Sequence, residues 1–140
     1  MIKASANIPC PCGSGLKYKN CCRRYHQGAL APDALSLMKS RYSAYATGNA
    51  DYIIKTTHPD NSDCSEEKQG WRASILAFCK ETAFEGLKII DYNKECKNKE
   101  AFVTFEAYLS SGILKEKSRF LKTEERWLYV DGVVVFDEML

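Results

Sequence analysis

The spacing of apolar residues changes along the chain, from a helical period to an alternating one. In the first part, apolar side chains recur at steps of three and four residues, which predicts α-helices. The first helix is expected over residues 33–47, because Pro32 suits the first turn of a helix and Gly48 suits its carboxyl end. The apolar stripe along this helix consists of Leu35, Met38, Tyr42 and Tyr45.

Two more helices are expected before the pattern changes. A short one over residues 50–56 is stopped by His58 and Pro59, since the residue before a proline avoids the helical conformation. A longer one over residues 65–81 begins with a serine and two glutamates, which favour the start of a helix. Its inward side chains are Trp71, Ile75 and Phe78.

Beyond residue 86, apolar and polar residues alternate, which predicts β-strands. The expected strands cover residues 87–92, 101–109, 113–123 and 126–130. One face of the second strand is wholly apolar and carries Ala101, Val103, Phe105, Ala107 and Leu109. Helices followed by consecutive strands predict an α+β fold, with the helices packed on one face of a curved antiparallel sheet.

One dipeptide near the end of the chain predicts a tight turn. Asp131-Gly132 is typical of a two-residue type I′ hairpin, in which both central residues have a positive φ. Residues 133–136 are therefore expected to fold back and pair with residues 127–130 as a fifth strand.

Four of the seven cysteines lie within the thirteen-residue stretch C-P-C-G-S-G-L-K-Y-K-N-C-C. Gly13 and Gly15 can turn the chain so that the first pair of cysteines faces the second. Four thiolates favour Zn²⁺, at roughly 2.3 Å per Zn–S bond, and four protein ligands leave no open position, so the ion would be structural. The predicted ligands of this one zinc ion are Cys10, Cys12, Cys21 and Cys22. The alternatives are two disulfides or four reduced thiols; His26 is a nearby ligand candidate that the adjacent cysteines make unnecessary.

Composition indicates two parts of unequal size. With 140 residues, 45% of them hydrophobic and 27% charged, the chain fits a main domain over residues 28–140, here called the cone, and a small module over residues 1–27, here called the knuckle. The knuckle needs metal to fold, whereas the apolar pattern of the cone is complete and predicts that the cone folds alone. No apolar run approaches the roughly 18 residues of a membrane span, and residues 1–8 lack the features of a secretory signal. Seven cysteines without such a signal favour a reducing compartment, so we expect a cytoplasmic protein.

Charge is distributed unevenly between the two parts. The knuckle holds five of the 20 basic side chains and none of the 18 acidic ones. These cations can simply offset the negative charge of a zinc–thiolate cluster. Alternatively, they form a docking surface for an acidic protein or for nucleic acid, whose bases the knuckle's tyrosines could stack on. The candidate docking residues are Lys17, Tyr18, Lys19, Arg23 and Arg24.

The cysteine-rich stretch resembles the SEC-C motif, a small zinc module also found at the end of the preprotein translocase ATPase SecA. The resemblance covers the four cysteines, the Gly-Ser-Gly turn and the Lys-Tyr-Lys run over residues 17–19. In SecA this module docks the chaperone SecB and ribosomes. The resemblance therefore implies a protein partner, such as a chaperone or the ribosome, without naming one.

Four further stretches extend the resemblance over nearly the whole chain. They are L-M-K-S-R-Y-S-A-Y at 37–45, D-Y-I-I-K-T-T-H-P at 51–59, S-R-F-L-K at 118–122 and W-L-Y-V-D-G at 127–132. Together with the leading motif, they resemble the YchJ-like family of bacterial proteins. This resemblance implies that the cone has the nuclear transport factor 2-like fold, in which helices lie against a bent sheet. Some relatives carry a second SEC-C motif at the C-terminus, and the last residues of this sequence contain none.

A fold of this kind encloses a pocket that could bind a small ligand or support catalysis. The polar and aromatic residues that could line it are Arg41, His58, Trp71, Glu106, Arg119 and Trp127. A carboxylate and a histidine could transfer protons. Structural roles compete with this hypothesis: Glu106 can form an ion pair with Arg41 or Arg119, His58 can end a helix, and the tryptophans can belong to the core.

A binding function is favoured over an enzyme, because the sequence contains no Ser-His-Asp or Cys-His arrangement and no phosphate loop. The leading hypothesis is a cytoplasmic zinc-binding adaptor that docks through its SEC-C knuckle. The alternatives are an enzyme or small-ligand binder that uses the cone pocket, and a nucleic-acid binder that uses the basic knuckle. The sequence carries no signal for an oligomeric state.

Overall fold

The computed structural model describes residues 1–95 and 99–135. It has the predicted α+β architecture, with all helices before all strands. The helical elements are η1 (Tyr18–Asn20), α1 (Arg23–His26), α2 (Ala34–Thr47), α3 (Ala50–Lys55) and α4 (Lys68–Glu81). The strands are β1 (Phe84–Glu95), β2 (Glu100–Leu109), β3 (Gly112–Thr123) and β4 (Arg126–Val134). Within the described part, no helix combines the length and the apolar character that a membrane crossing needs.

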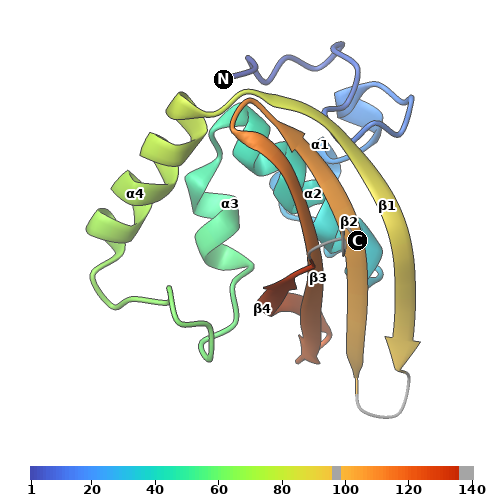
Figure 1. Ribbon diagram of the computed structural model, residues 1–140, viewed down its shortest axis with the longest axis vertical. Helices are drawn as coiled ribbons and strands as arrows, with labels where there is room; N and C mark the ends of the chain where they lie inside the picture. Colours follow the sequence, from blue (N-terminus) through green and yellow to red (C-terminus); the bar gives the residue numbers. More distant parts are fainter. Residues whose placement is uncertain (96–98, 136–140) are drawn as a thin grey trace, which may run out of the picture.

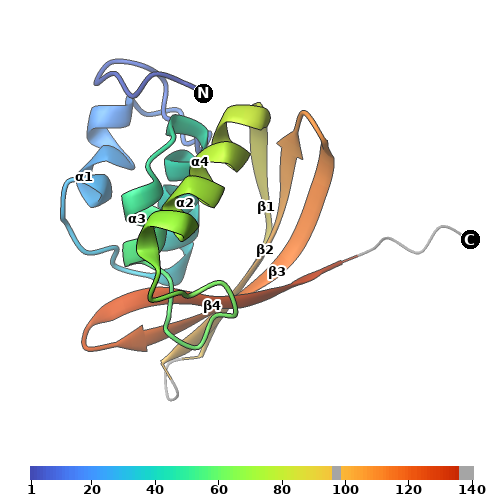
Figure 2. The same ribbon diagram turned by 90° about the vertical axis from the view of Figure 1, so that its left-hand side faces the viewer.

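The four strands form one antiparallel sheet in chain order, β1-β2-β3-β4. Helices α2, α3 and α4 lie on one face of this sheet, which bends around them (Figures 1 and 2). Register shifts between β1 and β2 and between β3 and β4 bend the strands, as β-bulges do. The predicted apolar face of β2 forms part of the core through Ala101, Val103, Phe105 and Ala107.

Helix α2 occupies the centre of the molecule. The carboxylate of Asp33 caps its start by accepting a hydrogen bond from Ser36 N, and Gly48 ends it with a φ of 75°. Its buried residues lie on nearly all sides of the helix: Ala34, Leu37, Met38, Ser40, Arg41, Tyr42, Ser43, Ala44 and Ala46. The expectation of one apolar stripe was too narrow, because the knuckle covers a second side of α2.

The predicted hairpin at Asp131-Gly132 is wrong. Both residues lie inside β4 and pair with β3, and Gly132 does not have a positive φ. A Cβ atom at Gly132 would collide with the carboxylate of Glu116, so this glycine permits a close approach within the sheet. Residues 133–135 continue alongside β3, and Phe136, the end of the predicted fifth strand, lies outside the described residues.

The turn between β3 and β4 is made by Glu124 and Glu125, whose φ angles are 50° and 67°. Positive φ is unfavourable for most side chains, and asparagine followed by glycine is the preferred pair for such a turn. Combining Glu124→Asn with Glu125→Gly should raise the free energy of unfolding in urea by about 1 kcal/mol. The control pair Glu124→Gln and Glu125→Gln removes the same two charges without relieving the backbone. Equal gains from both pairs would assign the effect to charge and contradict the prediction.

Candidate metal centre and cone cavity

The four cysteines of the motif converge at one point in the knuckle. The sulfur atoms of Cys10, Cys12, Cys21 and Cys22 all lie within 4.8 Å of one another. None of the four residues is more than 9% exposed. In a tetrahedral site with Zn–S bonds of about 2.3 Å, the sulfur atoms are separated by about 3.8 Å. The arrangement therefore fits an ion bound by four thiolates.

Two glycines fold the loop between the cysteine pairs. Gly13 and Gly15 have φ angles of 80° and 85°, as the sequence predicts. The chain returns so that Pro9 and Lys17 form an antiparallel bridge. Helix η1 then follows and brings the second cysteine pair opposite the first.

The electrostatics of the cluster favour a cation at its centre. Hydrogen bonds from Cys12 and Cys22 hold the pKa of the Cys10 thiol well below its usual value. The contact with Cys10 raises the pKa of Cys12 to about 11, and contacts with Cys10 and Cys12 raise the pKa of Cys22. The cluster thus accepts one negative charge easily and resists further ones, unless a divalent cation lies among the sulfur atoms.

Two serine hydroxyls contact sulfur atoms of the cluster. Ser14 Oγ lies 3.1 Å from Cys21 Sγ, and Ser43 Oγ lies 3.6 Å from Cys10 Sγ. Hydroxyl donors of this kind orient and stabilise thiolate ligands. Ser43 belongs to α2 and is fully buried, so the cone contributes a side chain to the centre. Sequence reasoning missed it, because nothing local relates Ser43 to a motif so far away in the chain.

His26 joins the knuckle to the cone. Its Nδ1 accepts a hydrogen bond from the Tyr18 hydroxyl at 2.5 Å, and its Nε2–H donates to the Ser40 carbonyl at 2.8 Å. Burial lowers the pKa of His26, which keeps the ring neutral in this arrangement. The ring also packs against Tyr52, with centroids 4.6 Å apart. Both ring nitrogens are engaged, so His26 is not oriented toward a metal.

Tyr18 must be removed from the predicted docking residues. Its side chain is only 4% exposed and packs with the cysteine cluster. Because its hydroxyl is bonded to His26, Tyr18 is part of the structural support of the knuckle.

The cations of the knuckle remain on its surface. Lys17, Lys19 and Arg24 are exposed, and Arg23 is half-buried. Arg24 Nε donates to the Cys21 carbonyl at 3.1 Å, and its guanidinium carbon lies 5.1 Å from the centroid of the Tyr25 ring. These contacts fix the position of one cation near the cysteine cluster.

The other cysteines lie apart from the cluster. Cys64 is exposed, Cys79 is buried in the core of the cone, and Cys96 lies outside the described residues. All described cysteines are free thiols, which disfavours the alternative of two disulfides in the knuckle.

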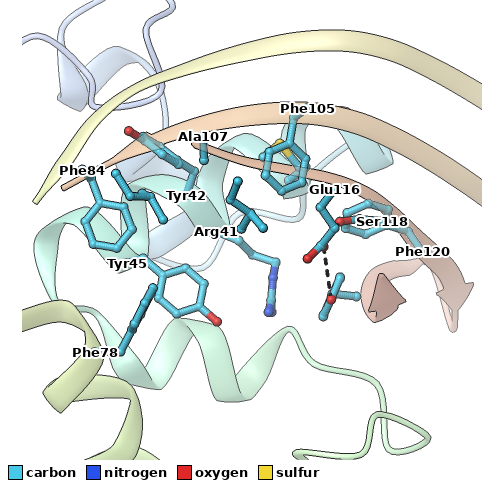
Figure 3. A pocket seen from close by; sticks show the side chains of 14 residues that line it. Arg41, Tyr42, Tyr45, Phe78, Phe84, Phe105, Ala107, Glu116, Ser118 and Phe120 are labelled. Carbon is cyan, nitrogen blue, oxygen red and sulfur yellow. Dashed lines mark hydrogen bonds between the residues drawn. The ribbon is translucent and has the colours of Figure 1, made fainter. Parts of the chain in front are cut away.

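A cavity of about 230 Å³ lies between helices α2 and α4 and the sheet (Figure 3). Its wall is mostly aromatic and aliphatic and comprises Met38, Tyr42, Phe78, Phe84, Phe105, Ala107, Leu109, Leu114 and Phe120. Its polar members are Arg41, Tyr45, Glu116, Ser118 and Tyr129. Of the pocket residues predicted from the sequence, Arg41 alone lines this cavity.

Glu116 is the carboxylate of the cavity. It accepts hydrogen bonds from the hydroxyls of Ser118 and Tyr129, the latter at 3.3 Å. Burial and the neighbouring Glu116 raise the pKa of Tyr129, which therefore remains a donor. Glu116 could have been found from strand parity, since Leu114, Ser118 and Phe120 share its face of β3.

The two charged residues predicted on the sheet lie elsewhere. Glu106 is on the opposite face of β2 from Phe105, because neighbouring residues of a strand point to opposite sides. Arg119 forms ion pairs with Glu100 at 3.2 Å and with Asp131 at 3.1 Å, outside the cavity. Arg119 therefore does not pair with Glu106, contrary to the ion-pair hypothesis.

The remaining three predicted pocket residues have structural surroundings. The backbone N–H of His58 donates to the Tyr129 carbonyl at 2.8 Å, and its ring Nδ1 accepts from Asp60 N at 3.0 Å. Trp127 is buried in the core, and Trp71 is half-buried against it. None of the three lines the cavity that contains Arg41.

Comparisons with known proteins agree over nearly the whole chain. Residues 33–132 match the family described as the YchJ middle NTF2-like domain, and residues 7–24 match the SEC-C motif. A UPF0225 protein of Photorhabdus laumondii is 42% identical over 135 residues, which cover 91% of this chain and 82% of that protein. The solution structure of a SEC-C motif containing protein from Rhodopseudomonas palustris is similar with a TM-score of 0.78 and 30% identity, covering 92% of this chain and 100% of that one. The crystal structure of a SEC-C motif containing protein from Psychrobacter arcticus gives a TM-score of 0.76 and 28% identity, covering 96% of this chain and 86% of that one.

Proposed function

The chain belongs to the YchJ-like (UPF0225) family and carries a SEC-C motif, and we propose that it is a zinc-binding adaptor of the cytoplasm. The knuckle holds one structural Zn²⁺ and docks onto an acidic protein surface, while the cone supports the knuckle. The observation that carries this proposal is a closed cluster of four cysteine sulfur atoms in a segment with five cations and no acidic side chain. Four ligands leave no position for a substrate, which favours binding over catalysis at this centre.

The donor set supports zinc as the ion. All four ligands are thiols, and tetrahedral sites of four thiolates are typical of structural zinc. The burial of the sulfur atoms excludes water from the ion, and the serine hydroxyls beside Cys10 and Cys21 stabilise the thiolate charge.

The exposed surface of the knuckle supports a protein partner over nucleic acid. Leu16 is 52% exposed next to Lys17, and an apolar side chain beside cations suits an acidic protein surface with an apolar contact. Stacking on bases needs accessible aromatic rings. Tyr18 is buried, and the ring of Tyr25 is half-buried beneath Arg24.

Reversing charge on the knuckle should abolish docking without removing the metal. Lys17→Glu with Lys19→Glu changes two exposed side chains, and Lys80→Glu with Lys122→Glu makes the same charge change on the exposed surface of the cone. The native chain and both variants serve as baits in a nuclease-treated bacterial lysate, and captured proteins are identified by mass spectrometry. The native chain and the cone variant are expected to retain the same protein, and the knuckle variant to lose it.

Two results would contradict the adaptor proposal. One is an identical capture by the knuckle variant and the native chain. The other is a partner that is retained from untreated lysate and lost after nuclease treatment, which would support nucleic-acid binding instead.

A further inference from the structure

Arg41 is a buried cation that no carboxylate pairs with in the described part of the chain. It is 7% exposed, and no carboxylate oxygen of the described residues lies within 4.0 Å of its nitrogens. Its Nη1 donates to the Ile53 carbonyl at 3.1 Å and to the hydroxyls of Thr56 and Thr57 at 2.8 and 3.2 Å. Nε and Nη2 donate to no described residue. The guanidinium carbon lies 4.6 Å from the centroid of the Tyr129 ring, a cation–π contact that leaves Nε and Nη2 available in the cavity to donate to an anion.

The acceptors of Arg41 have other hydrogen bonds. The Ile53 carbonyl also accepts from the Thr57 hydroxyl at 2.6 Å, and the Thr56 hydroxyl itself donates to the Tyr52 carbonyl at 2.7 Å. If Arg41 were removed, these buried polar atoms at the carboxyl end of α3 would still have hydrogen-bond partners. The hydrogen bonds to this helix end use Nη1 alone and leave the other two guanidinium nitrogens for a ligand.

Tyr45 supplies a second donor beside Arg41. The two residues lie one turn apart on α2, and both extend into the cavity from that helix (Figure 3). Burial raises the pKa of Tyr45, so its hydroxyl stays protonated at neutral pH. Its hydroxyl donates to no described residue. One end of the cavity thus presents uncommitted donors from a guanidinium and a phenol.

The rest of the cavity limits the size and the charge of a ligand. Aromatic side chains of α4 and the sheet, among them Phe78, Phe84 and Phe105, form an apolar wall. An apolar cavity of about 150 Å³ holds benzene, so by proportion a cavity of about 230 Å³ has space for roughly nine non-hydrogen atoms. Glu116 places a negative charge in the same cavity and disfavours a ligand with two negative charges, such as a phosphate monoester or a dicarboxylate.

We propose that the cone cavity binds a monocarboxylate with a compact apolar body, whose carboxylate is held by Arg41 and Tyr45. Phe78 is 41% exposed and lines the cavity, so the ligand would enter past this side chain. This function is independent of docking by the knuckle.

Titration calorimetry with two matched pairs of compounds tests the assignment. Phenylacetate and octanoate each have ten non-hydrogen atoms, and phenylacetamide and octanamide have the same shapes without the charge. At least one acid should bind the metal-loaded chain. Its amide should bind at least about tenfold more weakly, because a hydrogen bond to a charged group is lost. Equal binding of the acid and its amide would overturn the proposal, as would the absence of binding by both acids.

Three variants locate the site. Ala107→Leu fills the cavity with apolar atoms and Arg41→Met removes the cation, and each should reduce binding of the acid by about tenfold or more. Arg119→Met removes an arginine outside the cavity and should leave binding unchanged. If Arg41→Met fails to fold, Ala107→Leu still tests the site, since this variant keeps Arg41 and its hydrogen bonds. Native affinity in Ala107→Leu would place the binding elsewhere and overturn the assignment.

Discussion

Replacing Cys22 with serine should release the metal and lower the free energy of unfolding of the cone by about 4 kcal/mol or more. Cys22 is 1% exposed in the centre of the cluster, and a serine hydroxyl is a poor substitute for a thiolate ligand. Without the ion the knuckle unfolds and uncovers a side of α2 on which Ser40 and Ser43 are fully buried. The cone should remain folded in water, because its own core does not include the cluster. Native mass spectrometry counts the ion, and urea unfolding followed by tryptophan fluorescence reports the cone alone, since Trp71 and Trp127 both lie there.

Cys64→Ser is the matched control for this substitution. Cys64 is an exposed thiol outside the cluster, so its replacement should change neither the metal content nor the urea midpoint. If Cys22→Ser still held one ion per chain, the cluster would not be the metal site. If it lost the ion but kept the native urea midpoint, the knuckle would give the cone no support.

Replacing His26 with alanine should lower the free energy of unfolding by about 2 kcal/mol while the metal stays bound. The substitution removes hydrogen bonds to Tyr18 and to the Ser40 carbonyl, together with the ring contact to Tyr52. It leaves the buried Tyr18 hydroxyl without its partner, which is costly, whereas the Ser40 carbonyl keeps its hydrogen bond within α2. Urea unfolding and native mass spectrometry measure the two outcomes on the same sample.

The second histidine provides the comparison. His58 makes one side-chain hydrogen bond, to Asp60 N in a loop, so His58→Ala should lower the free energy of unfolding by less than about 1 kcal/mol. Equal losses from the two substitutions would show that His26 is no special link between knuckle and cone. Loss of the ion from His26→Ala would instead suggest a role for His26 at the metal.

Helices and strands were predictable from the sequence where the spacing of apolar residues follows the buried face. The alternation along β2 corresponds to the buried face from Ala101 to Ala107, and Gly48 ends α2 in the left-handed conformation that a helix end favours. The burial of α2 on a second side was not predictable, because it comes from a knuckle that packs there through His26 and Ser43. Small and polar residues at those positions gave no apolar signal.

Turns were less predictable, because local preference competed with pairing in the sheet. Asp131-Gly132 has the composition of a hairpin turn, but Gly132 lies beside Glu116 within the sheet and the chain continues straight. The actual turn uses two glutamates, which no preference for positive φ would select.

The cysteine cluster was easier to predict from the sequence than the cone cavity. The four cysteines lie close in sequence, so their spacing already indicated a common centre. The cavity is assembled from α2, α4 and all four strands, and its membership depends on strand register. For that reason Arg41 was found, whereas Glu106 was chosen in place of Glu116.

X-ray absorption spectroscopy of the purified protein at the zinc edge reports directly which atoms surround the metal in the knuckle. A closed site of four thiolates predicts one zinc ion per chain with four sulfur neighbours at about 2.3 Å and no nitrogen or oxygen neighbour. A nitrogen in the first shell would assign a ligand such as His26, and a protein without zinc would leave the knuckle as a cluster of thiols. Either result would contradict a closed, structural zinc centre formed by Cys10, Cys12, Cys21 and Cys22.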